Sequence, residues 1–228
     1  MIWTLYRHYK GMHYLRLGQV RHSEDCSELT LYRCLYDNPL GKTWVRPRAM
    51  FEDSLPDGRK RFTPIARVRT VEREDEPTVL MFGYDAWGKG RAHPDFIDEY
   101  QTRNKNHLRG TRFLLETLDG VPLCNLNTLR FARGVIGIAS VATAPEHRRK
   151  GHARRLLGAV LELFRFQNED ENGDLRFLLF SEVPPEIYEP CGFRVLPKQY
   201  QHWEPSVAMA TGTLPLAPRE SEILKTYF

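Results

Sequence analysis

Long apolar runs, closely paired cysteines and a strong charge of one sign are all lacking from this sequence. The longest apolar stretches, such as residues 135–144, fall far short of the roughly 20 residues that a membrane helix needs. The four cysteines form no C-x-x-C pair, which argues against a zinc site or a disulfide framework. The formal net charge is +4, which suits acidic ligands but is too weak to demand nucleic acid.

The first eight residues also lack the apolar core and cleavage site of a secretion signal. Hydrophobic residues make up 41% and charged residues 27% of the 228 residues, a balance that excludes a disordered or collagen-like chain. This length allows one large domain or two small ones. We therefore expect a reduced, cytoplasmic protein with no metal and with neither a membrane nor a nucleic-acid partner.

The amino-terminal part of the chain is rich in aromatic residues and short alternating runs. Alternation of apolar and polar residues predicts strands over residues 12–20, 29–36 and 43–46. Several short strands in about sixty residues suggest a small β-barrel. An exposed turn or linker over residues 53–64 then predicts a boundary, so we expect an all-β domain over residues 1–63.

The rest of the chain mixes strands and helices, which predicts an α+β domain over residues 64–212 and a tail over residues 213–228. We expect strands over residues 65–71, 111–118, 123–131, 134–143, 175–180, 193–196 and 207–210. We expect helices over residues 77–87, from Pro94 to about His107, and over residues 146–166 and 185–189. Asp119-Gly120 marks a hairpin turn.

One stretch carries the signature of a chemical site. A buried strand ends at about Thr143 and is followed by a tight turn with Gly151 and a helix whose first turn is basic. A helix start presents unpaired N–H groups and a positive dipole end, which suits an anion. Cations at that position oppose the dipole, so Arg149 and Arg154 make sense if a polyanion binds there. The pattern therefore predicts a pyrophosphate cradle.

Two motifs now resemble a known superfamily. Arg148-x-x-Gly151-x-Ala153 resembles the Gln/Arg-x-x-Gly-x-Gly/Ala signature of the GNAT acyl-CoA-dependent N-acetyltransferases. Downstream, Tyr188 followed by Gly192-Phe193 resembles their second motif, an aromatic-bearing helix that leads into a strand. The order of predicted elements also matches, over about residues 65–212. The resemblance implies a GNAT fold, a mixed and mostly antiparallel central sheet flanked by helices.

The resemblance also implies which residues bind acetyl-CoA as co-substrate. The strand before the signature would be splayed by a bulge and would pair with the pantetheine arm, and the signature turn would bind the pyrophosphate. Ser181 stands where many relatives have an asparagine that contacts the cofactor. The implied contacts are Val141, Ala142, Thr143, Arg148, Arg149, Lys150, Gly151, His152, Ala153, Arg154 and Ser181.

The implied reaction is direct transfer of an acetyl group to a primary amine while both substrates are bound. A backbone N–H near Thr143 would polarise the thioester carbonyl, and Tyr188 would donate a proton to the departing thiolate. For the general base the sequence offers Glu182 and Glu116, although both also suit surface carboxylates. Cys191 is expected to be a packed thiol rather than a nucleophile.

The amino-terminal domain resembles a small bacterial domain of unknown function over about residues 4–63. The resemblance lies in Tyr6-Arg-His-Tyr-Lys-Gly and, further on, Thr43-Trp-Val-Arg-Pro. It implies an SH3-like barrel but no chemistry. The aromatic and cationic residues of this domain either bind nucleic-acid bases or a peptide, or fill and solvate a small barrel.

Three functions are compatible with these patterns. The first is an N-acetyltransferase whose amino-terminal barrel assists acceptor binding. The second is a non-catalytic acyl-CoA-binding regulatory protein whose barrel binds RNA or peptide. In the third the barrel seals or dimerises the fold. The amine acceptor stays open, whether small molecule or protein, and the aromatic end Tyr227-Phe228 leaves a homodimer open as well.

Overall fold

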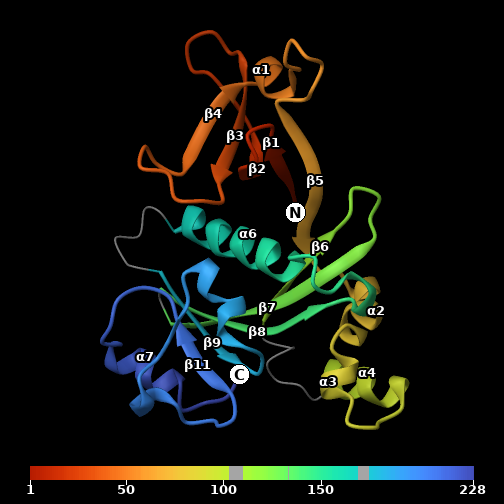
Figure 1. Ribbon diagram of the computed structural model, residues 1–228, viewed down its shortest axis with the longest axis vertical. Helices are drawn as coiled ribbons and strands as arrows, with labels where there is room; N and C mark the ends of the chain where they lie inside the picture. Colours follow the sequence, from red (N-terminus) through yellow and green to blue (C-terminus); the bar gives the residue numbers. More distant parts are fainter. Residues whose placement is uncertain (103–109, 133, 169–174) are drawn as a thin grey trace. The chain divides into compact units, whose positions relative to one another are not determined.

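The computed structural model describes residues 1–102, 110–132, 134–168 and 175–228 (Figure 1). Its contacts divide the chain into two compact units. Unit 1 contains Met1–Thr70 and Leu115–Pro122, and unit 2 contains Val71–Leu114 and Leu123–Phe228. The turn Leu115–Pro122 carries the predicted Asp119-Gly120 hairpin, in which Thr117 N–H donates to the carbonyl of Val121 at 2.9 Å.

Unit 1 is built on five strands in the order β5-β1-β2-β3-β4. They are β1 (Ile2–His8), β2 (His13–Arg21), β3 (Glu28–Cys34), β4 (Thr43–Pro47) and β5 (Phe62–Thr70), with the short helix α1 (Arg48–Glu52) after β4. The predicted strands at 12–20, 29–36, 43–46 and 65–71 are confirmed to within a few residues. The sequence analysis missed β1, although its buried Trp3 and Leu5 alternate with more exposed neighbours.

The predicted SH3-like barrel is not confirmed, because these strands form an open sheet. β4 pairs with β3 and lies at the end of the strand order, without closing onto β5. The reason lies in α1, whose buried Phe51 stacks on Phe62 at a ring-centroid distance of 4.2 Å. Phe51 thus helps to cover the aromatic cluster that includes Tyr14 and Tyr32, and closure of the sheet is not needed to bury it.

Unit 2 combines a mixed sheet with helices, which confirms the predicted α+β class. Its strands follow the order β10-β11-β9-β8-β7-β6. They are β6 (Thr111–Glu116), β7 (Pro122–Ala132), β8 (Val135–Thr143), β9 (Arg176–Ser181), β10 (Arg194–Val195) and β11 (Val207–Ala210). The last two residues of β6 and the first residue of β7 belong to unit 1. β8 and β9 are parallel, whereas β8 pairs with β7, and β11 with β9, in antiparallel fashion.

The helices of unit 2 differ from the prediction at three places. The predicted helix 77–87 is divided into α2 (Glu76–Met81) and α3 (Tyr84–Trp87) at Gly83, where a Cβ would lie 2.1 Å from the Trp87 ring. The predicted helix 185–189 is a pair of 3-10 turns, η3 (Pro185–Ile187) and η4 (Glu189–Cys191). The helix predicted from Pro94 is α4 (His93–Thr102), and its expected end near His107 lies outside the described residues.

The long helix predicted over residues 146–166 is α6 (His152–Gln167), which starts six residues later than expected. A 3-10 turn, η2 (Pro145–His147), precedes it. Between the two, Arg149 and Gly151 adopt left-handed backbone conformations with φ of 62° and 76°. A right-handed helix cannot run through such residues, so the signature forms a turn instead of a first helical turn.

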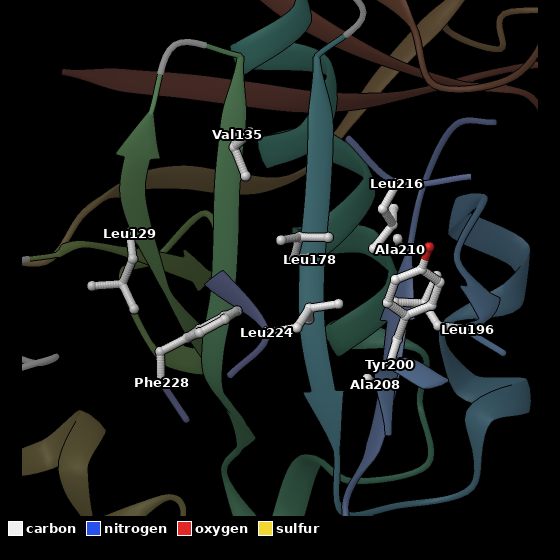
Figure 2. Close-up of a cluster of buried hydrophobic side chains, with 10 residues drawn as sticks. All are labelled: Leu129, Val135, Leu178, Leu196, Tyr200, Ala208, Ala210, Leu216, Leu224 and Phe228. Carbon is white, nitrogen blue, oxygen red and sulfur yellow. The ribbon is translucent and has the colours of Figure 1, made fainter. Parts of the chain in front are cut away.

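The sheet of unit 2 is covered on both faces. On one face Phe177 of β9 meets Phe164 of α6 at a ring-centroid distance of 6.2 Å. The adjacent Leu178 points to the other face, as neighbours in a strand do, and lies in the cluster of Figure 2 together with Leu224 and Phe228. Leu224 follows α7 (Pro218–Ile223), so the carboxy-terminal tail packs onto its own sheet.

The sequence analysis left open that Tyr227 and Phe228 contact a second copy of the chain; Phe228 is buried within unit 2, whereas Tyr227 is 42% exposed. Phe228 is 8% exposed and packs beside Phe131 at 4.7 Å between ring centroids. Gly137 makes this packing possible, since a Cβ there would lie 2.6 Å from the Phe228 ring. No helix in the described part of the chain has both the length and the apolar character that a membrane crossing requires.

Candidate active site

The strand pair β8–β9 opens at its carboxyl end. Parallel pairing runs from Val135 opposite Arg176 to Ile138 opposite Leu179 and, within the described residues, goes no further. Just beyond, Ser140 and Val141 of β8 both lie opposite the single residue Leu126 of β7, which is a β-bulge. Ser140 has a φ of 49°, and the bulge begins where the pairing between β8 and β9 ends. The splay implied by the resemblance is thus present at residues 139–143.

The turn after β8 leaves the start of α6 without a side-chain cap. Gly151 caps α6 in a left-handed conformation, and a Cβ added there would meet nothing within 4 Å. No side chain caps the helix, and its first turn contains no acidic residue. The backbone is left-handed at Arg149 and at Gly151 but not at Lys150 between them. Backbone whose handedness alternates in this way forms anion-binding nests. This turn has the shape and the partial charges that a pyrophosphate needs.

The basic side chains of the turn divide into two groups. Arg149 and Arg154 are exposed, and so is Lys150, whose ammonium donates to the carbonyl of Glu146 at 3.1 Å. His152 is half-buried, and its burial, helped by nearby Arg155, lowers its pKa, so the ring is neutral near pH 7. Exposed cations around a bare helix start remain available to phosphate oxygens.

Arg148 is also exposed, but its guanidinium is bound by other residues of the protein. Its guanidinium donates to both oxygens of Asp85, at 2.6 and 2.8 Å, and to the carbonyls of Phe82 and Thr143, at 2.9 and 3.2 Å. The hydrogen bond from Arg148 holds the pKa of the Asp85 carboxyl below its ordinary value. Arg148 therefore ties α3 to the end of β8, a positioning role that the signature alone did not reveal.

Tyr188 lies between η3 and η4 and is 8% exposed. Burial, with smaller contributions from Cys124 and Glu182, raises its pKa to about 12. Cys124 faces Thr143 in the β7–β8 pair, and Cys124 and Tyr188 lie near enough to influence one another. Tyr188 is thus a protonated phenol near neutral pH, as a proton donor must be.

Cys191 behaves as a packed thiol. Burial raises its pKa to about 11, so the thiolate that a nucleophile needs is scarce near neutral pH. Its Sγ contacts the carbonyl of Arg154 in the first turn of α6 at 3.9 Å. Cys191 therefore helps to attach η4 to α6.

Ser181, predicted to contact the cofactor, is buried at the end of β9. Its hydroxyl donates to the carbonyl of Val183 at 2.5 Å and accepts from the N–H of the same residue at 3.3 Å. The hydroxyl is therefore used within its own turn. Ser181 therefore shapes the end of β9.

Glu182 follows directly and is exposed. Its Oε2 accepts from the indole Nε1 of Trp87 at 3.1 Å, and its Oε1 accepts from the hydroxyl of Tyr227 at 2.7 Å. The sequence analysis placed position 87 at the end of a predicted helix and Tyr227 in the tail. No spacing could have joined positions 87, 182 and 227, because only the folded chain brings them together.

Glu116, the second candidate base, is buried in unit 1 between two arginines. Its Oε1 lies 2.9 Å from Arg67 Nε, and its Oε2 lies 2.9 Å from Arg69 Nε. A buried carboxylate held by two guanidinium groups is arranged as a structural ion pair. We therefore assign Glu116 a role in stability and not in proton transfer.

The variant Glu116→Gln tests this assignment. Removing the charge leaves two arginines around a neutral amide, so we expect the free energy of unfolding to fall by about 3–5 kcal/mol. Urea titration measures this, with Glu74→Gln, at an exposed carboxylate, as the control. The rate at which the folded variant releases thiol from acetyl-CoA should be unchanged. Unaltered stability together with lost activity would instead return Glu116 to the candidate bases.

Two parts of the chain match the models of known families. Residues 82–171 match the model of the acetyltransferase (GNAT) family, and residues 4–64 match a family described as a protein of unknown function, DUF1653. The second motif, around Tyr188, lies beyond the matched residues. A search of curated proteins found no match.

Solved structures with a similar arrangement include two acetyltransferases. A protein of Lactobacillus plantarum, described as an N-acetyltransferase, is 19% identical, with a TM-score of 0.49 over 64% of this chain and 97% of its own. The PaiA N-acetyltransferase of Thermoplasma acidophilum, solved with coenzyme A, is 15% identical, with a TM-score of 0.48 over 65% of this chain and 99% of its own. From the family models, residues 82–171 of this chain belong to the GNAT acetyltransferase family, and residues 4–64, which precede them, belong to the DUF1653 family.

Proposed function

We propose that this protein is a cytoplasmic N-acetyltransferase that moves an acetyl group from acetyl-CoA to a primary amine. The observation that carries the proposal is the combination of an uncapped α6 start at left-handed Gly151 with an opening between β8 and β9. The first feature suits a pyrophosphate, and the second leaves strand backbone unpaired beside it.

The residues present fit acetyl-CoA at this place. The backbone of Val141, Ala142 and Thr143, beyond the last β8–β9 pair, is proposed to hold the pantetheine arm as an added strand. The backbone N–H groups of residues 149–154 are proposed to hold the pyrophosphate, with the exposed side chains of Arg149, Lys150 and Arg154 adding charge. When bound, the thioester of acetyl-CoA would supply an activated acetyl group for the transfer.

Tyr188 is proposed as the general acid of the transfer. The neutral amine nitrogen forms a bond to the carbonyl carbon, the carbon–sulfur bond breaks, and the Tyr188 hydroxyl gives its proton to the departing sulfur. The surplus proton of the amine passes to water, and solvent returns a proton to Tyr188. A backbone N–H near Thr143 is proposed to stabilise the charge that develops on the carbonyl oxygen.

The test is a thiol-release assay with acetyl-CoA and a panel of primary amines. We expect release that depends on one class of amine and a product that is heavier by one acetyl group. Acetyl-CoA binding by calorimetry without release for any amine would favour the alternative, a non-catalytic acyl-CoA-binding regulator.

For residues 4–64 we propose a role in acceptor binding. The same assay tests this role through exposed variants such as Lys10→Glu, with an altered KM for the amine as the expected result.

A further inference from the structure

Glu182 is held in place by neutral donors from two distant parts of unit 2. The indole of Trp87 and the hydroxyl of Tyr227 each donate to one oxygen of its carboxylate. Tyr227 is itself positioned by Phe180, which stacks on it at 5.1 Å between ring centroids, and by Ser206, whose Oγ lies 3.2 Å from its hydroxyl. The carboxylate is thus oriented without being neutralised.

This cluster lies where the two strands of the site diverge. Glu182 directly follows β9, whereas Trp87 belongs to α3, which Arg148 ties to the carbonyl of Thr143 at the end of β8. The charge of Glu182 also contributes to the raised pKa of Tyr188 and of Tyr100, after the larger effect of burial. Glu182 therefore lies close enough to the proposed acid for its charge to be felt there.

The charge of Glu182 is available to a ligand. Among the residues that the structure describes, no Lys, Arg or His lies within ion-pairing distance of it, and the side chain is exposed. The helix α4 adds Asp95 and Asp98, both exposed. The cation next to the cluster is Arg91, which donates to the carbonyl of Trp87 and is paired with the Glu99 carboxylate. A fixed carboxylate beside indole and phenol rings is a typical recognition site for an alkylammonium group.

The chemistry of transfer indicates which ammonium group would bind. A nearby negative charge stabilises the protonated form of an amine, but an amine can attack a thioester only after losing its proton. Glu182 is therefore badly suited to hold the reacting nitrogen and well suited to hold another one. Resting on the function proposed above, we infer that the acceptor is a small diamine or polyamine whose second, non-reacting ammonium group binds the Glu182 carboxylate oriented by Trp87 and Tyr227.

Three four-carbon amines that differ only at the far end test this inference. They are 1,4-diaminobutane, n-butylamine and 4-aminobutyrate, which carry an ammonium, a methyl and a carboxylate group there. We expect kcat/KM for acetylation of the diamine to exceed that for butylamine about 10-fold to 100-fold, with 4-aminobutyrate lower still. A lysine-containing peptide, included in the same assay, distinguishes a protein side chain from a small amine.

Substitutions then separate binding of the second charge from proton transfer. Glu182→Gln should raise KM for the diamine by at least about 10-fold and leave acetylation of butylamine nearly unchanged. Trp87→Phe and Tyr227→Phe, which keep the ring and remove the donor, should raise the same KM by about 3-fold each. Glu186→Gln removes an exposed carboxylate on η3 and serves as the matched control.

Calorimetry of 1,4-diaminobutane binding to the protein saturated with coenzyme A provides a readout that needs no turnover, and Glu182→Gln should weaken that binding about 10-fold or more. Equal loss of kcat for the diamine and for butylamine in Glu182→Gln would identify a general base and overturn the inference, while the proposed function would stand. Preference for the peptide over the diamine would also overturn it. Unaltered diamine binding in Glu182→Gln would overturn the inference, whether or not any amine is acetylated. Absence of acetylation for every amine would refute the proposed function separately.

Discussion

Gly151→Glu is expected to weaken acetyl-CoA binding by about 100-fold or more. A Cβ added at position 151 would meet no atom within 4 Å, so a glutamate fits there, and its carboxylate would repel a pyrophosphate bound at this turn. Left-handed backbone at this position, with a φ of 76°, also strains any side chain by about 1–2 kcal/mol. Isothermal calorimetry with coenzyme A measures the loss directly, without turnover.

A matched glycine separates the two effects of this change. Gly58 has a φ of 81° and open surroundings as well, but it lies in an exposed turn of unit 1. Gly58→Glu should therefore cost similar backbone strain in a thermal melt while leaving coenzyme A binding intact. If both variants bound coenzyme A as tightly as the wild type, the turn at Gly151 would not be the pyrophosphate site.

Tyr188→Phe is expected to lower kcat by about 100-fold while KM for acetyl-CoA changes little. The ring remains and fills the same buried place, but no proton is available for the departing sulfur. Tyr200→Phe is a suitable control, because Tyr200 is also a buried tyrosine of unit 2 but lies in the cluster of Figure 2. Steady-state thiol release measures both variants.

The pH dependence of the wild type provides a second test of Tyr188. A tyrosine with the ordinary pKa near 10 would be half ionised at pH 10 and would then be lost as an acid. Burial raises the pKa of Tyr188 to about 12, so the proton stays on the phenol throughout the neutral and mildly alkaline range. We therefore expect kcat not to fall between pH 7 and pH 10. A fall with a midpoint below pH 10, absent in Tyr188→Phe, would contradict this environment.

The sequence predicted the strand and turn chemistry of the site better than its side-chain contacts. The motif around Gly151 predicted a tight turn after a buried strand, and the structure contains both, with left-handed backbone at Gly151. Arg148 was expected to face the cofactor, yet its guanidinium is used by Asp85, 63 residues away in the chain. A local sequence pattern can identify a turn whose backbone N–H groups lack partners. It cannot distinguish an arginine that binds phosphate from one that binds a distant carboxylate.

The two candidate bases illustrate the same limit. Glu116 and Glu182 were equivalent as single acidic residues after or within predicted strands. The fold surrounds Glu116 with Arg67 and Arg69, and it gives Glu182 only neutral donors. Partners so far apart in the chain depend on strand order and on the path of the tail, neither of which leaves a trace in residue spacing.

The sequence by itself determined the α+β class, most of the strands and the position of the anion cradle, because these depend on alternation, apolar periodicity and glycine placed within a few residues. Tertiary structure alone decided that the strands of unit 1 stay open, since Phe51 of α1 helps to bury their aromatic face. It also decided that Tyr227 reaches Glu182, since burial of Leu224 and Phe228 brings the tail back onto its sheet. The hydrophobic effect is non-directional, so an apolar residue in the sequence does not specify which distant residues it will contact in the fold.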